Sequence, residues 1–181
     1  GKVVPRQAVQ TLREMKGIRD FGLSYCYMLP DAENVSKQED LAKIKRVNGQ
    51  ETMQFDMGFD ENCMIYGFDA PALSLAQVIE GSVDYEKLCT GNYVVMVGYL
   101  DDRSEFHDEL QYYHAGDVIA AEIGGATQEY TVLAVLGMPS SMMMSYSSGG
   151  YECIGFAEPV FLEKFPMMQQ PIHCLFNAAE G

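Results

Sequence analysis

The sequence predicts an α+β fold, on three observations. Apolar residues recur at helical spacing near the start of the chain, at Ala8, Val9, Leu12 and Met15. Apolar and polar residues then alternate from Phe21 to Leu29, which is typical of a strand with one buried face. Further strand-like runs follow without a regular strand–helix alternation, so a parallel α/β sheet is not expected.

The first helix and strand have clear start and stop signals. Pro5 suits the first turn of a helix, and Gly17 is a suitable stop. The alternating strand ends at Pro30-Asp31. Together these signals predict one helix followed by one strand within the first 30 residues.

A second helix is predicted before residue 50. Ser36 and Glu39 have capping-box spacing, in which each side chain bonds the backbone N–H of the other residue. Leu41 and Ile44 would share one face of this helix, and Asn48-Gly49 would end it.

The centre of the chain reads as strands separated by glycines. Two strands are expected in residues 51–68, around the turn 56–62. A capping-box pattern at Ser74–Gln77 predicts a helix over 74–80 that ends at Gly81, and 84–89 adds one more turn. A strand over 93–98 and a hairpin follow, the hairpin pairing 118–123 with 129–136 through a glycine-containing loop.

The remaining segments complete the α+β pattern. An acidic connection is expected over 101–108, with a short helix from Ser104, and 140–150 is a loop rich in Ser, Gly and Met. Pro159 would start a last helix with Phe161, Leu162 and Phe165 inward. Residues 172–176 would form the last strand. Its apolar face of Ile172, Cys174 and Phe176 matches that of the strand from Phe21 to Leu29, so we expect the two strands to lie in one sheet.

Charge and hydropathy exclude some classes of function. The net charge of −14 disfavours binding to nucleic acid and docking on anionic lipid headgroups. The longest apolar runs, 93–100 and 130–138, are far shorter than the about 20 residues of a membrane-spanning helix. The N-terminus lacks the apolar core of a signal peptide. We therefore interpret the chain as an excised piece of a longer protein.

No residue pattern indicates an enzyme, a cofactor or a metal. The five cysteines form no Cys-x-x-Cys pair, and buried free thiols are expected. His107, His114 and His173 are scattered and expected at the surface, without the clustering that zinc needs. The acidic runs 56–62 and 101–109 lack EF-hand spacing and read as solvated faces.

The methionine run in the loop 140–150 is the one candidate contact site. Met142, Met143 and Met144 precede Tyr146, and flexible thioether side chains suit apolar partners of variable shape. Filling of the core by one or two of these methionines, with the rest in a loop, is slightly favoured over this partner contact, and binding of Cu(I) ranks third.

The central string resembles the extracytoplasmic domain of MacB/FtsX-like ABC transporter permeases. The resemblance rests on five pieces in order: Tyr66-Gly67-Phe68, Val78-Ile79-Glu80-Gly81, Gly91-Asn92-Tyr93-Val94-Val95-Met96, Tyr113-His114-Ala115-Gly116-Asp117-Val118-Ile119 and Tyr130-Thr131-Val132-Leu133-Ala134-Val135-Leu136-Gly137. It covers residues 51–138. The acidic residues at 101–109 and the methionine loop depart from it.

The resemblance implies a fold in two parts and a role without catalysis. A mixed α/β membrane-proximal subdomain would use both chain ends, 1–49 and 139–181, with a β-rich subdomain, 50–138, inserted between them. The domain would stand on the extracytoplasmic face of the cell membrane, between two membrane helices of a permease. Its expected partners are a cytoplasmic ATPase subunit, a second permease copy, and an extracytoplasmic lipoprotein or a peptide or lipid substrate.

Two other functions stay open. A free-standing secreted binding or adhesion module is the main alternative, although the sequence contains no Trp for an aromatic platform. A hydrolase using Cys or His is the third. Apolar segments of about 20 residues flanking the chain in its parent protein would favour the permease domain.

Overall fold

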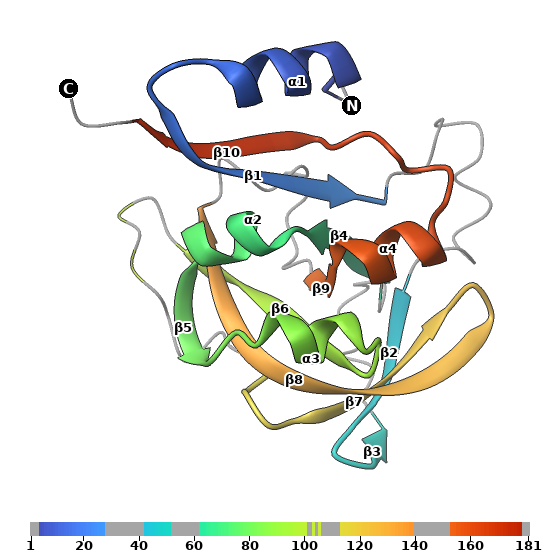
Figure 1. The fold of residues 1–181 in the computed structure, drawn as a ribbon. Helices are drawn as coiled ribbons and strands as arrows, with labels where there is room; N and C mark the ends of the chain where they lie inside the picture. The colour runs from blue at the N-terminus through green and yellow to red at the C-terminus, as the bar shows by residue number, and fades with distance from the viewer. Residues whose placement is uncertain are drawn as a thin grey trace.

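The structure, a computed structural model, describes residues 4–27, 42–51, 62–100, 103, 105, 113–139 and 153–178. These residues form four helices and one mixed sheet of ten strands, which confirms the α+β fold (Figure 1). The helices are α1 (Arg6–Glu14), α2 (Ala70–Leu75), α3 (Tyr85–Cys89) and α4 (Glu158–Lys164). The strands are β1 (Ile18–Cys26), β2 (Ala42–Val47), β3 (Gln50–Glu51), β4 (Asn62–Phe68), β5 (Gln77–Gly81), β6 (Tyr93–Leu100), β7 (Val118–Ile123), β8 (Ala126–Pro139), β9 (Cys153–Ala157) and β10 (His173–Ala178).

Six of the strands close into a ring. The pairings run β4–β9–β6–β8–β7–β2, and β2 returns to pair with β4. The β4–β9 and β6–β8 pairs are parallel, and the other pairs of the ring are antiparallel. Closure leaves the ring without a free edge, which protects its strands from pairing with other chains. Strands β1 and β10 extend the sheet beyond β4 and lie outside the ring.

Aromatic side chains fill the core where α4 meets the sheet. Phe161 on α4 is fully buried, and its ring lies 5.8 Å from that of Tyr25 on β1. Phe156 on β9 meets Tyr130 on β8 edge-on at 5.4 Å. A Cβ added at Gly67 would lie 2.5 Å from Cγ of Phe161, so a glycine there lets the helix approach β4 closely.

Two predicted pairings are confirmed. Strands β7 and β8 form the expected hairpin, with a tight turn in which Gly124 and Gly125 both have positive φ. That hairpin and β6 belong to the same sheet. The predicted neighbourhood of the first and last strands is also confirmed, because β1 pairs with β10.

The prediction of a second helix ending at Asn48-Gly49 was wrong. Residues 42–47 form β2, in which Ile44 is buried, Lys45 is partly exposed and Arg46 is exposed. The Ser36–Leu41 part of the predicted helix lies outside the described residues. Asn48 and Gly49 have φ of 51° and 78° and join β2 to β3 in a tight hairpin. Asn-Gly suits both a helix end and such a hairpin, and here strand pairing decides.

The predicted helix over 74–80 was also placed wrongly. The helix is α2, which begins after Asp69, and residues 77–81 form β5 paired with β8. Asp69 accepts from the N–H of Ala72, and Pro71 occupies the first turn. An N-cap Asp followed by Pro is a stronger start signal than the capping-box pattern at Ser74. Ser74 instead donates to the carbonyl of Pro71 inside the helix.

Other predicted features agree or fall outside the described residues. Helix α3 follows its N-cap Asp84, and α4 places Phe161 and Phe165 in the core as expected. The helix from Ser104 and the loop 140–150 lie outside the described residues. The division into 1–49 with 139–181 and 50–138 stays a prediction; β2 and β9 of the outer segments take part in the closed ring.

Candidate functional site

The elements next to both ends of the described chain form one layer, which we call the terminal layer: α1, β1 and β10. β1 and β10 are antiparallel, with Ile18 opposite Ala178 and Ser24 opposite His173. The chain also begins beside the start of β10, because the Val4 N–H donates to the carbonyl of Pro171 at 2.8 Å. Figure 1 shows this layer at the top, with α1 above β10 and β1.

Helix α1 rests on this layer as a surface helix. It follows Pro5 and contains no buried residue, and Val9 is among its side chains that pack partly against the core. The guanidinium of Arg13 stands over the ring of Phe21 on β1, 5.5 Å from its centre. Such a cation–π contact contributes about 0.5–1 kcal/mol at exposed sites. The helix is therefore held by few contacts.

Asp69 joins the terminal layer to the ring. Strand β1 pairs with β4 only through Ser24–Cys26, opposite Tyr66–Phe68. Immediately after β4, the Oδ1 atom of Asp69 accepts from the N–H groups of Leu23 and Ala72, both at 2.9 Å. The Asp69 N–H donates to the carbonyl of Leu23 at 3.2 Å. Asp69 thus hydrogen-bonds to β1 just beyond the β1–β4 pairing and also caps α2.

Helix α2 takes the place of β4 beside the first half of β1. A Cβ added at Gly22 would lie 2.4 Å from the backbone nitrogen of Ala72 and 2.6 Å from its Cα. Such distances leave no room for any other residue at position 22. The backbone of α2 therefore touches the backbone of β1 directly.

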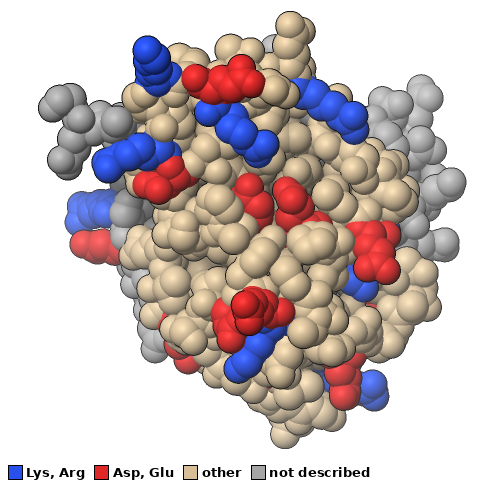
Figure 2. Space-filling model, in the orientation of Figure 1, with Lys and Arg blue, Asp and Glu red and all other residues tan. Residues whose placement is uncertain are grey.

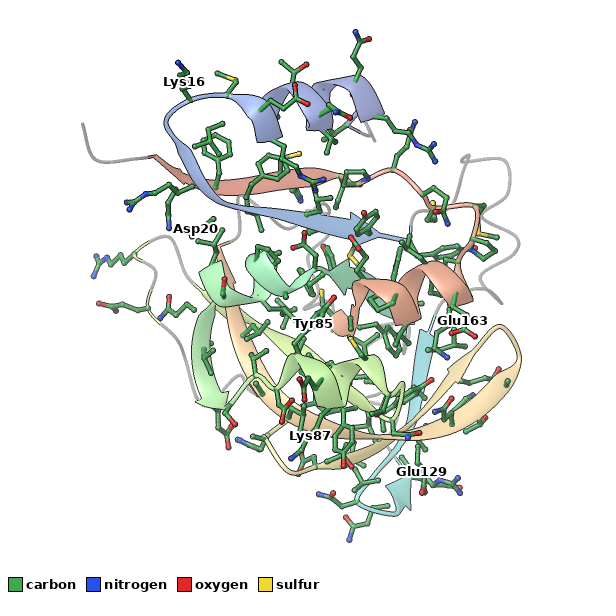
Figure 3. The ribbon with its side chains drawn as sticks, in the orientation of Figure 1. Lys16, Asp20, Tyr85, Lys87, Glu129 and Glu163 are labelled. Carbon is green, nitrogen blue, oxygen red and sulfur yellow. The ribbon has the colours of Figure 1, made fainter. Side chains whose placement is uncertain are left out.

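Four polar side chains that interact with one another form what we call the polar junction: Tyr25, Asp69, Tyr85 and Glu158. Tyr25 is 5% exposed, and burial raises its pKa well above the usual range. Its hydrogen bond to Glu158 is the second largest cause of the raised pKa. Burial raises the pKa of Tyr85 to about 12, with further contributions from Cys89, Glu158 and Asp69. Tyr85 starts α3, which contacts α4 (Figure 3).

The chemistry of the polar junction is structural. Both phenols stay neutral at physiological pH, so Tyr25 donates to the carboxylate of Glu158. The positive charge of Arg13 lowers the pKa of Tyr25 and so opposes Glu158 and Asp69, which raise it. These groups come from β1, the N-cap of α2, α3 and α4, with Arg13 from α1. The junction thus ties the terminal layer to the helices that cover the ring.

Two solved structures share this architecture. One is the extracellular domain of the noncanonic ABC-type transporter YknZ from Gram-positive bacteria, with a TM-score of 0.50 and 11% identity over 99% of this chain and 75% of that chain. The other is the periplasmic region of MacB from Actinobacillus actinomycetemcomitans, with a TM-score of 0.50 and 10% identity over 99% of this chain and 67% of that chain. The chain has a MacB-like fold. No family model matches the sequence, and no curated protein matches it.

The two histidines that the structure describes differ in exposure. His114 is exposed and its Nδ1 lies 3.0 Å from a carboxylate oxygen of Glu80. His173 is partly buried rather than at the surface as expected, with Nδ1 3.3 Å from the hydroxyl of buried Ser24. His107 lies outside the described residues. In the described part of the chain, no three His, Cys, Asp or Glu side chains gather where a metal could bind.

The cysteines only partly fit the expectation of buried thiols. Cys26 and Cys153 are buried and Cys174 is partly buried, but Cys89 at the end of α3 is exposed. Cys26, Cys89 and Cys174 are free thiols. Burial raises the pKa of Cys26 to about 12, so its thiol is inert at neutral pH.

The candidate contact residues Met142, Met143, Met144 and Tyr146 lie outside the described residues, so their role stays a prediction. Among the helices that the structure describes, none has the length and hydropathy to span a bilayer. The polar junction was not predicted, because its members are far apart in sequence. Only the N-cap pattern at Asp69 could have indicated part of it.

Proposed function

We propose that this chain is the non-catalytic extracytoplasmic domain of an ABC transporter permease subunit. In this role it would couple ATP-driven movement of the membrane helices to export or handling of a substrate outside the membrane. The observation that carries the proposal is the likeness of fold, over 99% of the chain, to extracytoplasmic domains of two ABC-type transporters.

The terminal layer supports the same role. A domain inserted between two membrane helices receives and returns the chain on one side. The strands β1 and β10 of the terminal layer are paired with each other, which supports such an insertion. Movement of the membrane helices would reach this layer first, and the Asp69 link and the polar junction would pass it to the ring.

The partners follow from this placement. They would be a cytoplasmic ATPase subunit, reached through the rest of the permease, and a second permease copy. An extracytoplasmic lipoprotein, or a peptide or lipid substrate, would meet the domain outside the membrane. Met142, Met143, Met144 and Tyr146 are the proposed contact for such an apolar partner, and we propose no cofactor.

The exposed thiol of Cys89 provides a test in the full-length protein in its own cells. Cys89 should react with a membrane-impermeant maleimide in intact cells, and the protein should stay in the membrane fraction after a carbonate wash. The Cys89→Ser variant is the control, because labelling should fall when this thiol is removed.

The alternatives give different outcomes. A secreted binding or adhesion module would be labelled in intact cells but recovered in the soluble fraction. Labelling only after permeabilisation would place the domain in the cytoplasm and overturn the proposal. The sequence of the parent protein adds an independent test, since apolar segments of about 20 residues should flank this chain on both sides.

A further inference from the structure

We propose that the terminal layer lies directly on the anionic headgroups of the bilayer, through α1 and the turn that follows it. The inference deepens the proposed function and rests on it for the position of this layer beside a membrane. Charge is unevenly distributed along the chain. Residues 1–20 hold five of the 12 Lys and Arg residues but only two of the 26 Asp and Glu residues. This segment is therefore net positive in a chain of net charge −14.

The cations of this segment are accessible. Arg6 begins α1, Lys16 follows its end, and Arg19 lies early in β1, and all three are exposed. Figure 2 shows Lys and Arg over the top of the molecule, where Figure 1 places α1, with acidic side chains among them; the segment itself contributes the exposed Glu14 and Asp20. Lys16, labelled in Figure 3, points away from the sheet. Long basic side chains on a surface helix reach phosphate groups while the helix lies flat.

The neighbouring strand adds no opposing charge. Residues 165–179, which include β10, contain no Asp, Glu, Lys or Arg. Two exposed apolar side chains belong to the same layer: Met15 at the end of α1 is 50% exposed and Phe176 on β10 is 47% exposed. Cations combined with a few apolar side chains suit the interface between headgroups and acyl chains.

The acidity of the rest of the molecule does not prevent this contact. Charges farther than about 10 Å from the bilayer are largely screened at 0.1 M salt, whereas those at the surface act fully. The net negative charge of the whole chain is therefore a poor guide to what this one side binds.

Vesicle binding by the 181-residue chain tests the inference. The probes are vesicles of phosphatidylcholine alone and vesicles that contain about 30% phosphatidylglycerol, with binding measured by flotation at low salt. We expect binding to the anionic vesicles only, with loss as NaCl rises from about 50 mM to about 500 mM. Each basic residue at such a surface strengthens binding about five-fold. The variant R6E/K16E should therefore bind at least ~20-fold more weakly.

The matched control is R46E/K87E, which changes the net charge equally with two exposed cations on β2 and α3. It should keep binding to within about three-fold. Folding of the test variant is secure, since Arg6→Glu places an acid in the first turn of α1, which has none. Circular dichroism and thermal unfolding check this. Equal losses in both variants, or no preference for anionic vesicles, would overturn the inference.

The two proposals can fail separately. Vesicle binding concerns the surface of the terminal layer, while labelling of Cys89 in cells concerns the location of the domain. A protein labelled from outside that binds no anionic vesicles keeps the proposed function and loses the lipid contact. A protein that binds vesicles through α1 but is labelled only after permeabilisation keeps the surface and loses the proposed function.

Discussion

Asp69 is the residue on which the link between the terminal layer and the ring depends most. Its carboxylate accepts from both Leu23 and Ala72, so its removal leaves a strand N–H and a helix N–H without an acceptor. We expect Asp69→Ala to lower the free energy of unfolding by about 1–3 kcal/mol, which combines a lost cap with a lost part-buried hydrogen bond. Urea denaturation measures this.

Asp69→Asn is the matched control. The amide oxygen of Asn can still accept one or both bonds, and Asn is a good N-cap residue, so most of the stability should remain. If Asn costs as much as Ala, the charge of Asp69 matters and its hydrogen bonds do not. That result would contradict the role derived from the two bonds.

His173 should make stability depend on pH in the mildly acidic range. Burial lowers the pKa of His173 below the usual 6.5 of a histidine side chain, so the unfolded chain takes up a proton before the native protein does. The free energy of unfolding should therefore fall as pH decreases through about 6.5 and level off below the native pKa. Chemical denaturation at pH 7 and at about 5.5 measures the difference.

The variant His173→Gln isolates this contribution. Gln has no proton to gain and can still bond to Ser24, which lies 3.3 Å from the ring nitrogen. We expect the variant to lose less stability between the two pH values than the native sequence loses. An unchanged pH dependence would show that other groups cause it.

At the scale of elements, the contact between α2 and β1 requires glycine at position 22. Gly22→Ala places a Cβ against the backbone of Ala72, and backbone atoms cannot move aside as a flexible side chain can. We expect a loss of about 1–3 kcal/mol or more from this overpacking, measured by thermal or urea unfolding.

Gly155→Ala on β9 is the comparison. Its added Cβ would lie 2.7 Å from Cγ2 of Val95 and 2.8 Å from Cε2 of Phe68, which are both side-chain atoms. Rotation of Val95 and Phe68 can relieve part of that crowding, so this variant should cost less than Gly22→Ala. The reverse order would indicate that α2 moves away easily and does not hold β1.

Elements with consistent local signals were predictable from the sequence. The helix α1, the helical turn over 84–89 and the β7–β8 hairpin all agree with the structure. The errors came where one motif serves two structures. Asn48-Gly49 can end a helix or close a hairpin, and partners far along the chain decide between them, here β7 and β4 for β2.

The candidate site was less predictable than the elements. Tyr25, Asp69, Tyr85 and Glu158 look ordinary in the sequence, and only the packing of four elements brings them together. The Asp69–Ala70–Pro71 start signal was available, but the bonds of Asp69 to β1 depend on a contact 46 residues away. Long-range pairing of this kind leaves no local pattern to read.

At the scale of the whole molecule, the closed ring and the terminal layer differ in how firmly they are held. All five residues of β9 are buried, as are Val94–Val97 of β6. By contrast, α1 has no buried residue, and Phe176 and Asn177 of β10 are exposed. Regions with few buried contacts open with a lower free energy than the core.

Hydrogen exchange should therefore divide the molecule in two. We expect amides of α1 and β10 to exchange faster than those of β6 and β9 under native conditions, because the layer can open while the ring stays closed. Peptide-resolved exchange measured by mass spectrometry tests this. Asp69→Ala sharpens the test: it should raise exchange in β1 and β10 and leave β6 and β9 nearly unchanged. If the variant raises exchange equally throughout, layer and ring unfold as one unit. Force arriving through the chain ends would then act on the whole domain at once, and not first on the terminal layer.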